Sequence, residues 1–328
     1  MWKLTVLLVL LAPPEEHRIT ARPGSVQWGY HDAAVPPALT IHSGDTLIVE
    51  TLVTGARLLR AFGLPERYIR PEMETIDAQV RQEGPHLLVG PVAIEGAEPG
   101  DVLEIRFLEI EVIEDFAINL FRPGGGALPE RFPYQGTRVI PLDLERNVAV
   151  LSPGIEIPMR PFFGSVGVAP PLATGRIGSG PPGFHTGNID NKELVAGTKL
   201  FVPVHVPGAL LTVGDGHAGQ GDGEVDGTAL ETSLRGKLEI VLHKQRRLKW
   251  PRAETPDHII TMGLDPDLDA AAKLAVNEMV DYLVEERGLD ADDAYVLCSV
   301  AVDLRVTQLV DGTKGIHAML PKNIFTGK

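Results

Sequence analysis

The sequence predicts a mainly β protein: a β-sandwich or barrel-like core with long Gly/Pro-rich loops, followed by an α+β part at the C-terminal end. Three observations predict this class. The 328 residues include 35 Gly and 27 Pro, and turn residues at that density suit many short strands better than long helices. Hydrophobic residues make up 44% of the chain but aromatic residues only 5%, which indicates a globular core of aliphatic side chains. Between about residues 17 and 252, apolar and polar residues mostly alternate, as they do in half-buried strands.

The first strands are expected as hairpins. The segment "ALTIHSGDTLIVETLV" alternates, turns at Ser43-Gly44-Asp45 and alternates again. "LLVGPVAIEGAEPGDVLEIRFLEIEVI" repeats this pattern with a second Gly-Asp turn at Gly100-Asp101, which hints at related β-units. Further along, "TKLFVPVHVPGALLTVGDGH" predicts two strands and "ALETSLRGKLEIVLHK" predicts another pair. Residues 121–136 and 151–189 are rich in Gly and Pro and are interpreted as long ordered loops of the kind that carry function.

The pattern changes after residue 252. Asp265-Pro266 is a good helix start, apolar residues follow at helical spacing, and Gly288 is a good helix end. Asp290 is expected to cap a second, shorter helix, and a strand with a turn at Asp311-Gly312 follows. We therefore divide the chain into an N-terminal extension (1–16), a β-rich region (17–252) and an α+β region (253–328) packed on the same core.

Charge and cysteine content limit the partners and the compartment. The formal net charge of −14 makes nucleic acid an unsuitable partner. Cys298 is the single cysteine, so no internal disulfide forms, and a reducing, cytoplasmic location is the simplest interpretation. The apolar run 4–12 is too short to span a bilayer, so no membrane association is expected. Secretion remains the alternative if residues 1–12 act as a signal segment.

The stretch "GDGHAGQGDGEV", residues 214–225, concentrates polar side chains on a glycine-rich backbone. Asp215 and His217 are spaced two apart after a strand, so their side chains share one face, while Glu224 follows a bend. A solvated acidic turn is the simplest alternative. A calcium loop of the EF-hand kind fails, because Gln220 and Asp226 occupy its glycine and glutamate positions. Carboxylates with an imidazole suit a metal site of the zinc type or an acid–base site.

Other candidates are fewer. "HTGNIDN" places His185 and Asp190 in a loop that precedes these strands, although a structural turn is an alternative. His86 lies just before an apolar strand, where a histidine is often only packed. Neither a nucleophile elbow nor a phosphate-binding loop occurs, and the apolar flanks of Cys298 predict an inert thiol.

Several strings together resemble the acetamidase/formamidase family. They are "WGYHDAAVPPALTIHSGDTLIVET", "GPVAIEGAEPGDVLEI", "GNIDNKEL", "VPGALLTVGDGHAGQGDGEV" and "ITMGLDPDLDAAAKLA". The resemblance runs in order from about residue 17 to residue 325, and the chain departs from the pattern only in residues 1–16. It implies an amidase that cleaves small linear amides, formamide or acetamide, to ammonia and the carboxylate.

The resemblance also implies a β-rich homo-oligomer, a dimer or tetramer, with a bound divalent metal that is zinc or calcium. The matching strings contain Asp190, Asp215, His217 and Glu224. We assign the first three to the metal and Glu224 to the general base, and we expect His86 or His185 to orient the substrate or complete the ligand set. Two alternatives stay open: a hydrolase of another carbon–nitrogen bond, and a non-catalytic metal-binding β-protein.

Overall fold

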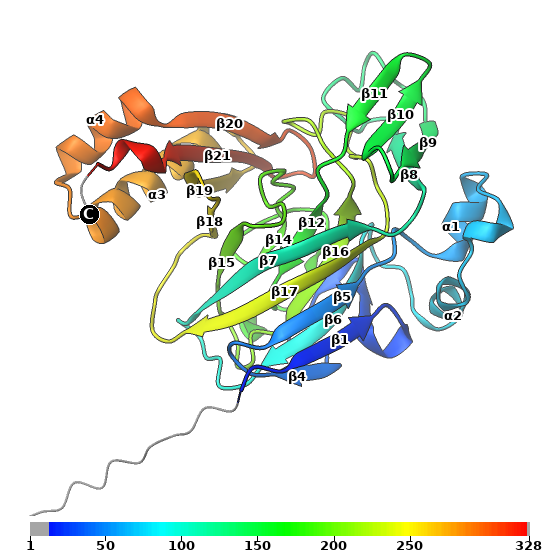
Figure 1. Cartoon of the computed structure of the whole chain (residues 1–328), viewed down its shortest axis with the longest axis horizontal. Coiled ribbons are helices and arrows are strands. Elements are labelled where there is room, and N and C mark those ends of the chain that lie inside the picture. The colour runs from blue at the N-terminus through cyan, green and yellow to red at the C-terminus, as the bar shows by residue number, and fades with distance from the viewer. Residues whose placement is uncertain (1–12, 327–328) are drawn as a thin grey trace, which may run out of the picture.

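A computed structural model describes residues 13–326, and its body is two β-sheets packed face to face (Figure 1). The larger sheet has nine strands, in the order β1 (Glu16–Thr20), β5 (Thr46–Glu50), β17 (Leu234–His243), β7 (Val102–Val112), β15 (Lys199–Pro203), β18 (Arg252–Glu254), β19 (His258–Asp265), β21 (Lys314–Pro321) and β20 (Asp303–Gln308). The second has six, in the order β14 (Thr186–Asn188), β12 (Phe162–Gly167), β16 (Leu211–His217), β6 (Leu87–Ile94) and β2 (Val26–Trp28), with β4 (Leu39–Ile41) beside β6. The predicted mainly β, sandwich-like class is confirmed.

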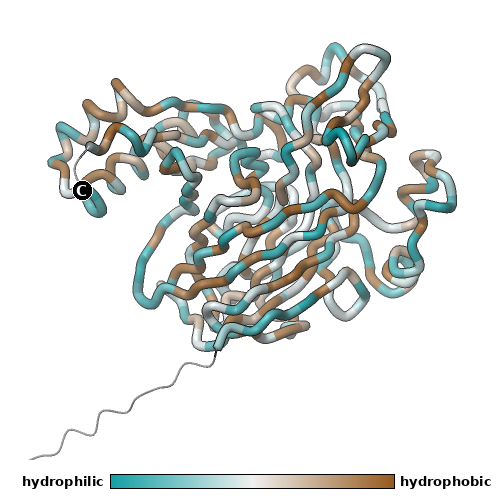
Figure 2. The backbone as a smooth tube through the Cα atoms, in the orientation of Figure 1, coloured by the Kyte–Doolittle hydropathy of each residue, from teal (hydrophilic) through white to brown (hydrophobic). Residues whose placement is uncertain are grey.

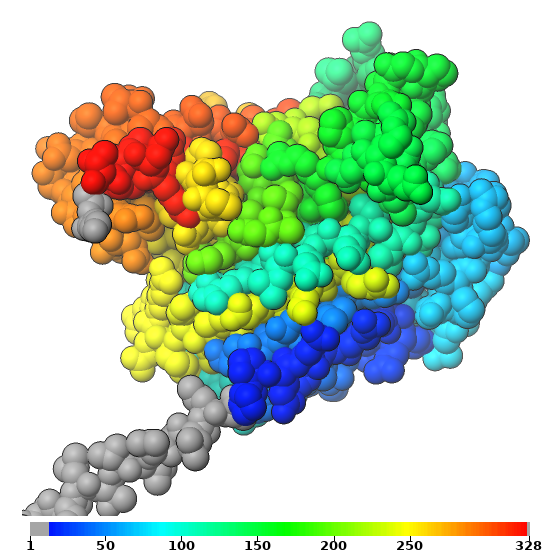
Figure 3. All heavy atoms as spheres, in the orientation of Figure 1, coloured from blue at the N-terminus to red at the C-terminus, as the bar shows by residue number. Residues whose placement is uncertain are grey.

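Smaller elements surround this body. A four-stranded sheet runs in the order β11 (Ile155–Pro158), β10 (Val148–Ser152), β9 (Gly136–Asp143) and β8 (Phe116–Phe121), and a two-stranded one joins β13 (Ile177–Gly178) to β3 (Tyr30–His31). The helices are α1 (Ala56–Ala61), α2 (Pro71–Gln79), α3 (Leu268–Arg287) and α4 (Ala291–Ala301). Short 3-10 turns occur at Pro23–Ser25, Glu66–Tyr68, Leu172–Thr174 and Lys322–Ile324. In Figure 3 the C-terminal part and the four-stranded sheet rise on opposite sides of the sandwich.

The main core lies between the two large sheets. Leu47, Ile105 and Leu238 from the nine-stranded sheet and Val89 and Val213 from the six-stranded sheet belong to one buried apolar cluster. The hydropathy colouring of Figure 2 follows this arrangement, with apolar residues recurring along the strands of the body. Aliphatic side chains thus fill the interior, as the composition predicted.

The two Gly-Asp turns are corners of the sandwich, so the prediction of hairpins was wrong. β4 pairs with β6 in one sheet, whereas β5 and β7 flank β17 in the other. Each turn therefore carries the chain from one sheet to the other. In both, the aspartate accepts the backbone N–H of the residue three positions earlier: His42 N to Asp45 Oδ2 at 2.7 Å and Glu98 N to Asp101 Oδ2 at 2.8 Å. The repeated sequence is thus a repeated corner.

Other expectations in the β-rich region need correction. Residues 229–244 contain one strand, β17, rather than a pair, because the chain before Leu234 bridges to neighbouring strands by isolated contacts. The span 151–189 is not a single loop, since it contains β11, β12, β13 and β14. The helices α1 and α2 were not predicted.

The C-terminal region follows the prediction closely. Helix α3 begins after Asp267, whose side chain accepts the N–H of Ala270, so the cap lies two residues beyond the predicted Asp265, which ends β19. Gly288 ends α3 in the left-handed conformation, and Asp290 caps α4, both as expected. The strands of this region continue the nine-stranded sheet from β15 through β18, which makes one continuous sheet of the two predicted regions.

Residues 1–12, for which a signal segment was the alternative to a simple N-terminal extension, lie outside the described residues. Over residues 13–326, helices of sufficient length and apolarity to span a bilayer are absent.

Candidate active site

The acidic side chains singled out in the sequence meet at one end of the sandwich. β16 carries Asp215 and His217, and the segment after it carries Glu224. The imidazole Nε2 of His217 lies 3.4 Å from Asp215 Oδ2 and 3.2 Å from Glu231 Oε2. Asp190, just after β14, joins His217 and Glu224 in a second group whose potential ligand atoms all lie within 4.8 Å of one another. His217 is thus shared by two sets of carboxylates.

Gly164 on β12 makes this convergence possible. A Cβ atom at this position would lie 2.5 Å from both Asp190 Oδ1 and Asp215 Oδ2, and 2.7 Å from His217 Cε1. Any side chain would therefore occupy the space in which the three functional groups meet. The sequence did not reveal Gly164, because it belongs to an apolar strand with no polar pattern around it.

Two glycines of the 214–225 stretch lie against the backbone of neighbouring segments. A Cβ at Gly214 would lie 2.8 Å from the carbonyl oxygen of Leu87, and one at Gly216 would lie 2.5 Å from that of Thr232. These glycines admit neighbouring backbone rather than a ligand, whereas Gly221 has nothing within 4 Å. They explain how a buried strand end can be packed tightly enough to hold the acids in place.

Four carboxylates of the site have left-handed backbone conformations. The φ angles are 44° at Asp190, 56° at Asp215, 43° at Glu224 and 64° at Asp311. Such conformations cost an L-residue of this kind about 1–3 kcal/mol when the surroundings impose them. Strained residues that cluster in one place are typical of functional sites, where the required position of a side chain outweighs the conformational preference of its backbone.

The tautomer of His217 follows from its neighbour Gln220. The Gln220 amide nitrogen donates to the carbonyl oxygen of Asp190 at 2.9 Å, so its oxygen faces His217 Nδ1 at 3.0 Å and can only accept. Nδ1 therefore carries a hydrogen, and Nε2 points at the carboxylates with either a proton or a lone pair. Burial would lower the pKa of His217, but Glu231 and Asp215 outweigh it and raise that pKa well above its usual value.

Burial also disturbs the acids. It raises the pKa of Asp190 and of Glu224 well above the ordinary carboxyl range, with Coulombic repulsion adding to the effect. The pKa of Glu231 is raised mainly for the same reason. Burial alone would raise the pKa of Asp215, but His86 and His217 hold it far below its usual value. Because several buried carboxylates repel one another, the cluster favours binding of a cation or protonation of some of its members.

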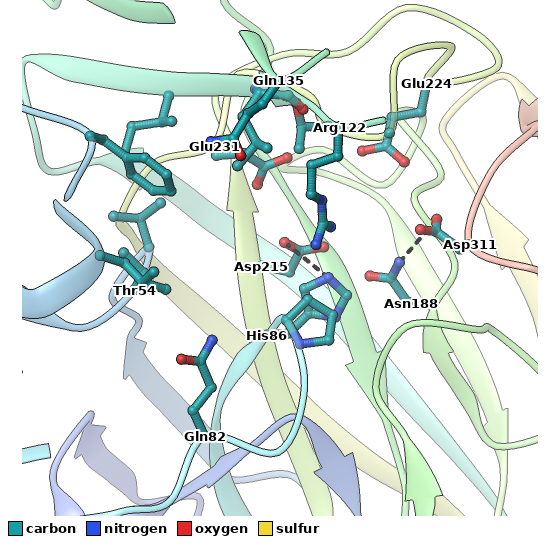
Figure 4. Close-up of a pocket in the computed structure, with 18 residues that line it drawn as sticks. Thr54, Gln82, His86, Arg122, Gln135, Asn188, Asp215, Glu224, Glu231 and Asp311 are labelled. Atoms are coloured by element: carbon teal, nitrogen blue, oxygen red, sulfur yellow. Dashed lines mark hydrogen bonds and ion pairs between the residues drawn. The ribbon is translucent and has the colours of Figure 1, made fainter. Parts of the chain in front are cut away.

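A pocket with a volume of about 340 Å³ opens onto this cluster (Figure 4). Asp215, Glu224, Glu231 and Asp311 reach it, and apolar residues form much of the remaining wall. His86 lies at its centre, with Nε2 3.9 Å from Asp215 Oδ1. Its Nδ1 lies 3.0 Å from the carbonyl oxygen of Ser179, which can only accept, so Nδ1 carries a hydrogen and donates it to that oxygen, which fixes the orientation of the ring.

His185 lies apart from the acids. Its ring packs against His31, with centroids 4.9 Å apart, and against Phe184 at 5.7 Å. Burial lowers its pKa to about 4, so the ring is neutral at physiological pH. It is absent from both carboxylate–imidazole groups and from the residues that line the pocket in the described part of the chain. Of the six sequence-derived candidates, the structure brings Asp190, Asp215, His217, Glu224 and His86 together.

Several residues of the site carried no recognisable sequence signal. Glu231 belongs to the segment interpreted as a strand, and Asp311 to a turn that seemed purely structural. Gln308 donates to Asp190 Oδ2 and to Asp311 Oδ2, both at 2.9 Å, and so connects the C-terminal region to the site. Asn188 donates to Asp190 Oδ2 at 2.8 Å. The spatial proximity of these residues comes from the fold, not from spacing in the sequence.

The donor set fits a divalent cation. In the described chain, the buried atoms Asp190 Oδ1 and His217 Nε2 have no hydrogen-bond partner, and both lie beside the gap left by Gly164. A metal-binding imidazole usually donates its other ring N–H to a neighbouring acceptor, as Nδ1 of His217 does to Gln220. Carboxylate oxygens with one imidazole nitrogen are suitable ligands for zinc or another hard or borderline divalent ion.

Comparison with known proteins identifies the family of the chain. The family described as "Acetamidase/Formamidase family" matches residues 16–176 and 172–327. An acetamidase structure from Bacillus halodurans has a TM-score of 0.81 and 32% identity, covering 94% of this chain and 98% of that one. A predicted acetamidase/formamidase structure from Thermoanaerobacter tengcongensis has a TM-score of 0.82 and 27% identity, covering 95% and 97%.

Curated relatives give the same result. The formamidase of Methylophilus methylotrophus is 29% identical over 316 residues, which are 73% of this chain and 77% of that one. The acetamidase of Mycolicibacterium smegmatis is 28% identical over 199 residues, 43% of this chain and 49% of that one. The chain thus spans about half the length of some curated relatives that it matches. Fold, site and relatives together support an amidase as the class of protein. The chain belongs to the acetamidase/formamidase family, which confirms the resemblance found in the sequence.

Proposed function

We propose that this protein hydrolyses the carbon–nitrogen bond of small aliphatic amides such as formamide and acetamide. One observation carries the proposal: a buried group of carboxylates around His217 opens onto a pocket of about 340 Å³ that has an apolar wall. An amide is a weak electrophile with a poor leaving group, so its hydrolysis needs an activated water and a proton for the departing nitrogen. The site offers groups suited to both tasks.

We assign Asp190, Asp215 and His217 to a divalent metal ion, zinc or calcium. Glu231 supports this assignment as a fourth candidate ligand, because its Oε2 lies 3.2 Å from His217 Nε2. When bound, such an ion supplies Lewis acidity, which lowers the pKa of water and polarises a carbonyl group. The left-handed backbone at Asp190 and Asp215 aims their carboxylates at the space beside Gly164.

Glu224 is the proposed general base. Its carboxylate lines the pocket, takes a proton from the attacking water and returns it to the leaving nitrogen, so that ammonia departs and the carboxylate product remains. The ring of His86, fixed by the Nδ1 contact with Ser179, lines the pocket, where its Nε2 is placed to contact the amide group. For His185, the predicted role in orienting the substrate or completing the ligand set stays a prediction, and its contact with His31 favours an indirect effect.

Paired variants test these roles. Glu224→Gln keeps the shape of the side chain but removes its basicity, so we expect full metal content and a loss of roughly two to four orders of magnitude in turnover. His217→Ala removes a shared ligand, so metal content and activity should fall together. Asp222→Asn is the matched control, because Asp222 lies in the same segment but pairs with Lys192 at the surface.

The measurements are metal stoichiometry by elemental analysis and ammonia release from formamide, acetamide and benzamide. Full activity of Glu224→Gln, or full metal content of His217→Ala, would overturn the assignment of roles. Activity on benzamide equal to that on acetamide would contradict the preference for small amides.

We also propose that the protein acts in the cytoplasm as a homo-oligomer, a dimer or tetramer. The single, unpaired Cys298 supports a reducing compartment. Helix α4 presents Tyr295, Val296 and Val300 at 67%, 59% and 74% exposure, an apolar surface suited to contact between copies. Sedimentation equilibrium of the purified protein tests this, and a monomer at all concentrations would refute it.

A further inference from the structure

Arg122 is a cationic side chain in the pocket to which the mechanism above gives no role. Among the lining residues that the structure describes, it is the one Arg or Lys. In Figure 4 its side chain extends from above, between Glu231 and Glu224, toward Asp215 and His86. It therefore points to the place where an amide would sit.

The position of Arg122 follows from strand alternation. Ile118, Leu120 and Arg122 are two residues apart along β8 and its continuation, so they share one face, and all three line the pocket. Phe121 points the other way, into a second, apolar cavity that it lines together with Phe132. The backbone of β8 is fixed beside the acids, because Ile118 and Glu231 exchange two backbone hydrogen bonds of 2.8 and 2.9 Å.

Arg122 stays unpaired although acids surround it. Within the described chain, each carboxylate of the pocket lies beyond ion-pair distance from its guanidinium group. By contrast, Arg70 and Arg235, which also lie near acidic side chains, both pair with Glu50 at 3.2 Å. Arg122 directly follows the last residue of β8, and its guanidinium group shares the pocket with these acids without pairing with them.

We propose that the guanidinium group of Arg122 binds the acyl oxygen of the amide and, after hydrolysis, an oxygen of the carboxylate product. A planar guanidinium offers several N–H donors and can bind both oxygens of a carboxylate at once. The ionised acids that line the pocket have no such donors. The guanidinium also offsets the repulsion that an anionic product meets from Asp215, Glu231 and their neighbours. This inference rests on the proposed amide hydrolysis for its substrate, but it predicts carboxylate binding independently of turnover.

The test compares Arg122→Met with Arg122→Lys in the metal-containing protein. Acetate is the probe, its dissociation constant is measured by calorimetry, and kcat/KM for acetamide is measured by ammonia release. We expect Arg122→Met to weaken acetate binding and to lower kcat/KM by roughly 10- to 100-fold each, the usual cost of losing a charged hydrogen bond. Arg122→Lys, which keeps the charge but not the fork, should lie between Arg122→Met and the unaltered protein.

Arg131→Met is the matched control. Arg131 lies in the same loop, but its guanidinium group covers the ring of Phe132 at 5.7 Å and does not line the pocket, so both quantities should stay unchanged. A folded Arg122→Met variant that binds acetate as tightly as the unaltered protein overturns the inference. A different outcome separates the two proposals. If the unaltered protein binds acetate but cleaves no amide, and Arg122→Met abolishes acetate binding, the proposed function fails and the carboxylate site stands.

Discussion

Substituting Gly164 by alanine tests whether the site depends on close approach of its three central side chains. The new methyl carbon would lie 2.5 Å from Asp190 Oδ1 and Asp215 Oδ2, whereas an ordinary contact begins at 3.4 Å. Each carboxylate would have to retreat by the difference, about 0.9 Å. His217 would have to move as well, because its Cε1 would lie 2.7 Å from the added carbon.

The substitution should affect activity more than stability. Inserting one methyl group into a packed interior typically costs about 1–3 kcal/mol in the free energy of unfolding, less than the 5–15 kcal/mol of a typical domain. The variant should therefore fold. Displacing catalytic groups by about 1 Å, however, commonly costs about 100-fold in rate. We expect a folded protein with reduced metal content and a loss of about 100-fold in kcat/KM for acetamide.

The assay combines thermal unfolding, elemental analysis and ammonia release. Gly221→Ala is the control: it lies in the glycine-rich segment beside the site, a Cβ there has nothing within 4 Å, and its backbone is not left-handed. Its activity and melting temperature should be close to those of the unaltered protein. Full activity and metal content in Gly164→Ala would show that activity does not depend on the positions of Asp190, Asp215 and His217. That result would refute their assignment to the site.

Two further predictions concern stability. Burial would raise the pKa of Asp101, but the Lys244 ammonium and the backbone N–H groups of Gln245 and Glu98 outweigh it and lower that pKa. Its contribution is therefore present above the unfolded-state value of about 4 and is lost as the pH falls through the folded-state value. Asp101→Asn should lower the free energy of unfolding by about 2 kcal/mol at pH 7. Denaturant titrations should show that the free energy of unfolding of the variant falls less steeply below pH 5 than that of the unaltered protein. The same decrease below pH 5 in both proteins would contradict this. Cys298→Ala should keep most activity and lose roughly 1–2 kcal/mol, and a loss of activity beyond about 100-fold in a folded variant would revive a thiol mechanism.

The sequence identified the strands better than their partners. The alternation in "ALTIHSGDTLIVETLV" does correspond to β4 and β5, but alternation describes only which side chains face a core. Whether two successive strands pair with each other or enter different sheets depends on the turn between them. Here the carboxylate of Asp45 accepts backbone N–H groups from His42 and Glu15, which stabilises a corner, and this long-range contact has no local sequence signature.

The same distinction between local and long-range relations applies to the site residues. Asp215 and His217 were found because a two-residue spacing on a strand fixes their relation locally. Glu231, Asp311 and Gly164 were missed because their relation to His217 arises only when β8, β12 and β20 are assembled. His185 was included for its position in the chain, but it lies in the turn just before β14, and its ring packs against His31 instead.

The loop that carries Glu224 is held between two parts of the chain that are made at very different times. Ala127 N donates to Val225 O on one side at 2.7 Å, and Leu309 N donates to Gly223 O on the other at 2.8 Å. Ribosomes add roughly 5–20 residues per second, so Leu309 emerges several seconds after the loop itself. During that interval the nascent chain carries the acids of the site without the residues that fix them, and the site can close only near the end of synthesis. Substitutions near Leu309 should therefore affect the yield of active protein during translation more than they affect the activity of protein that has already folded.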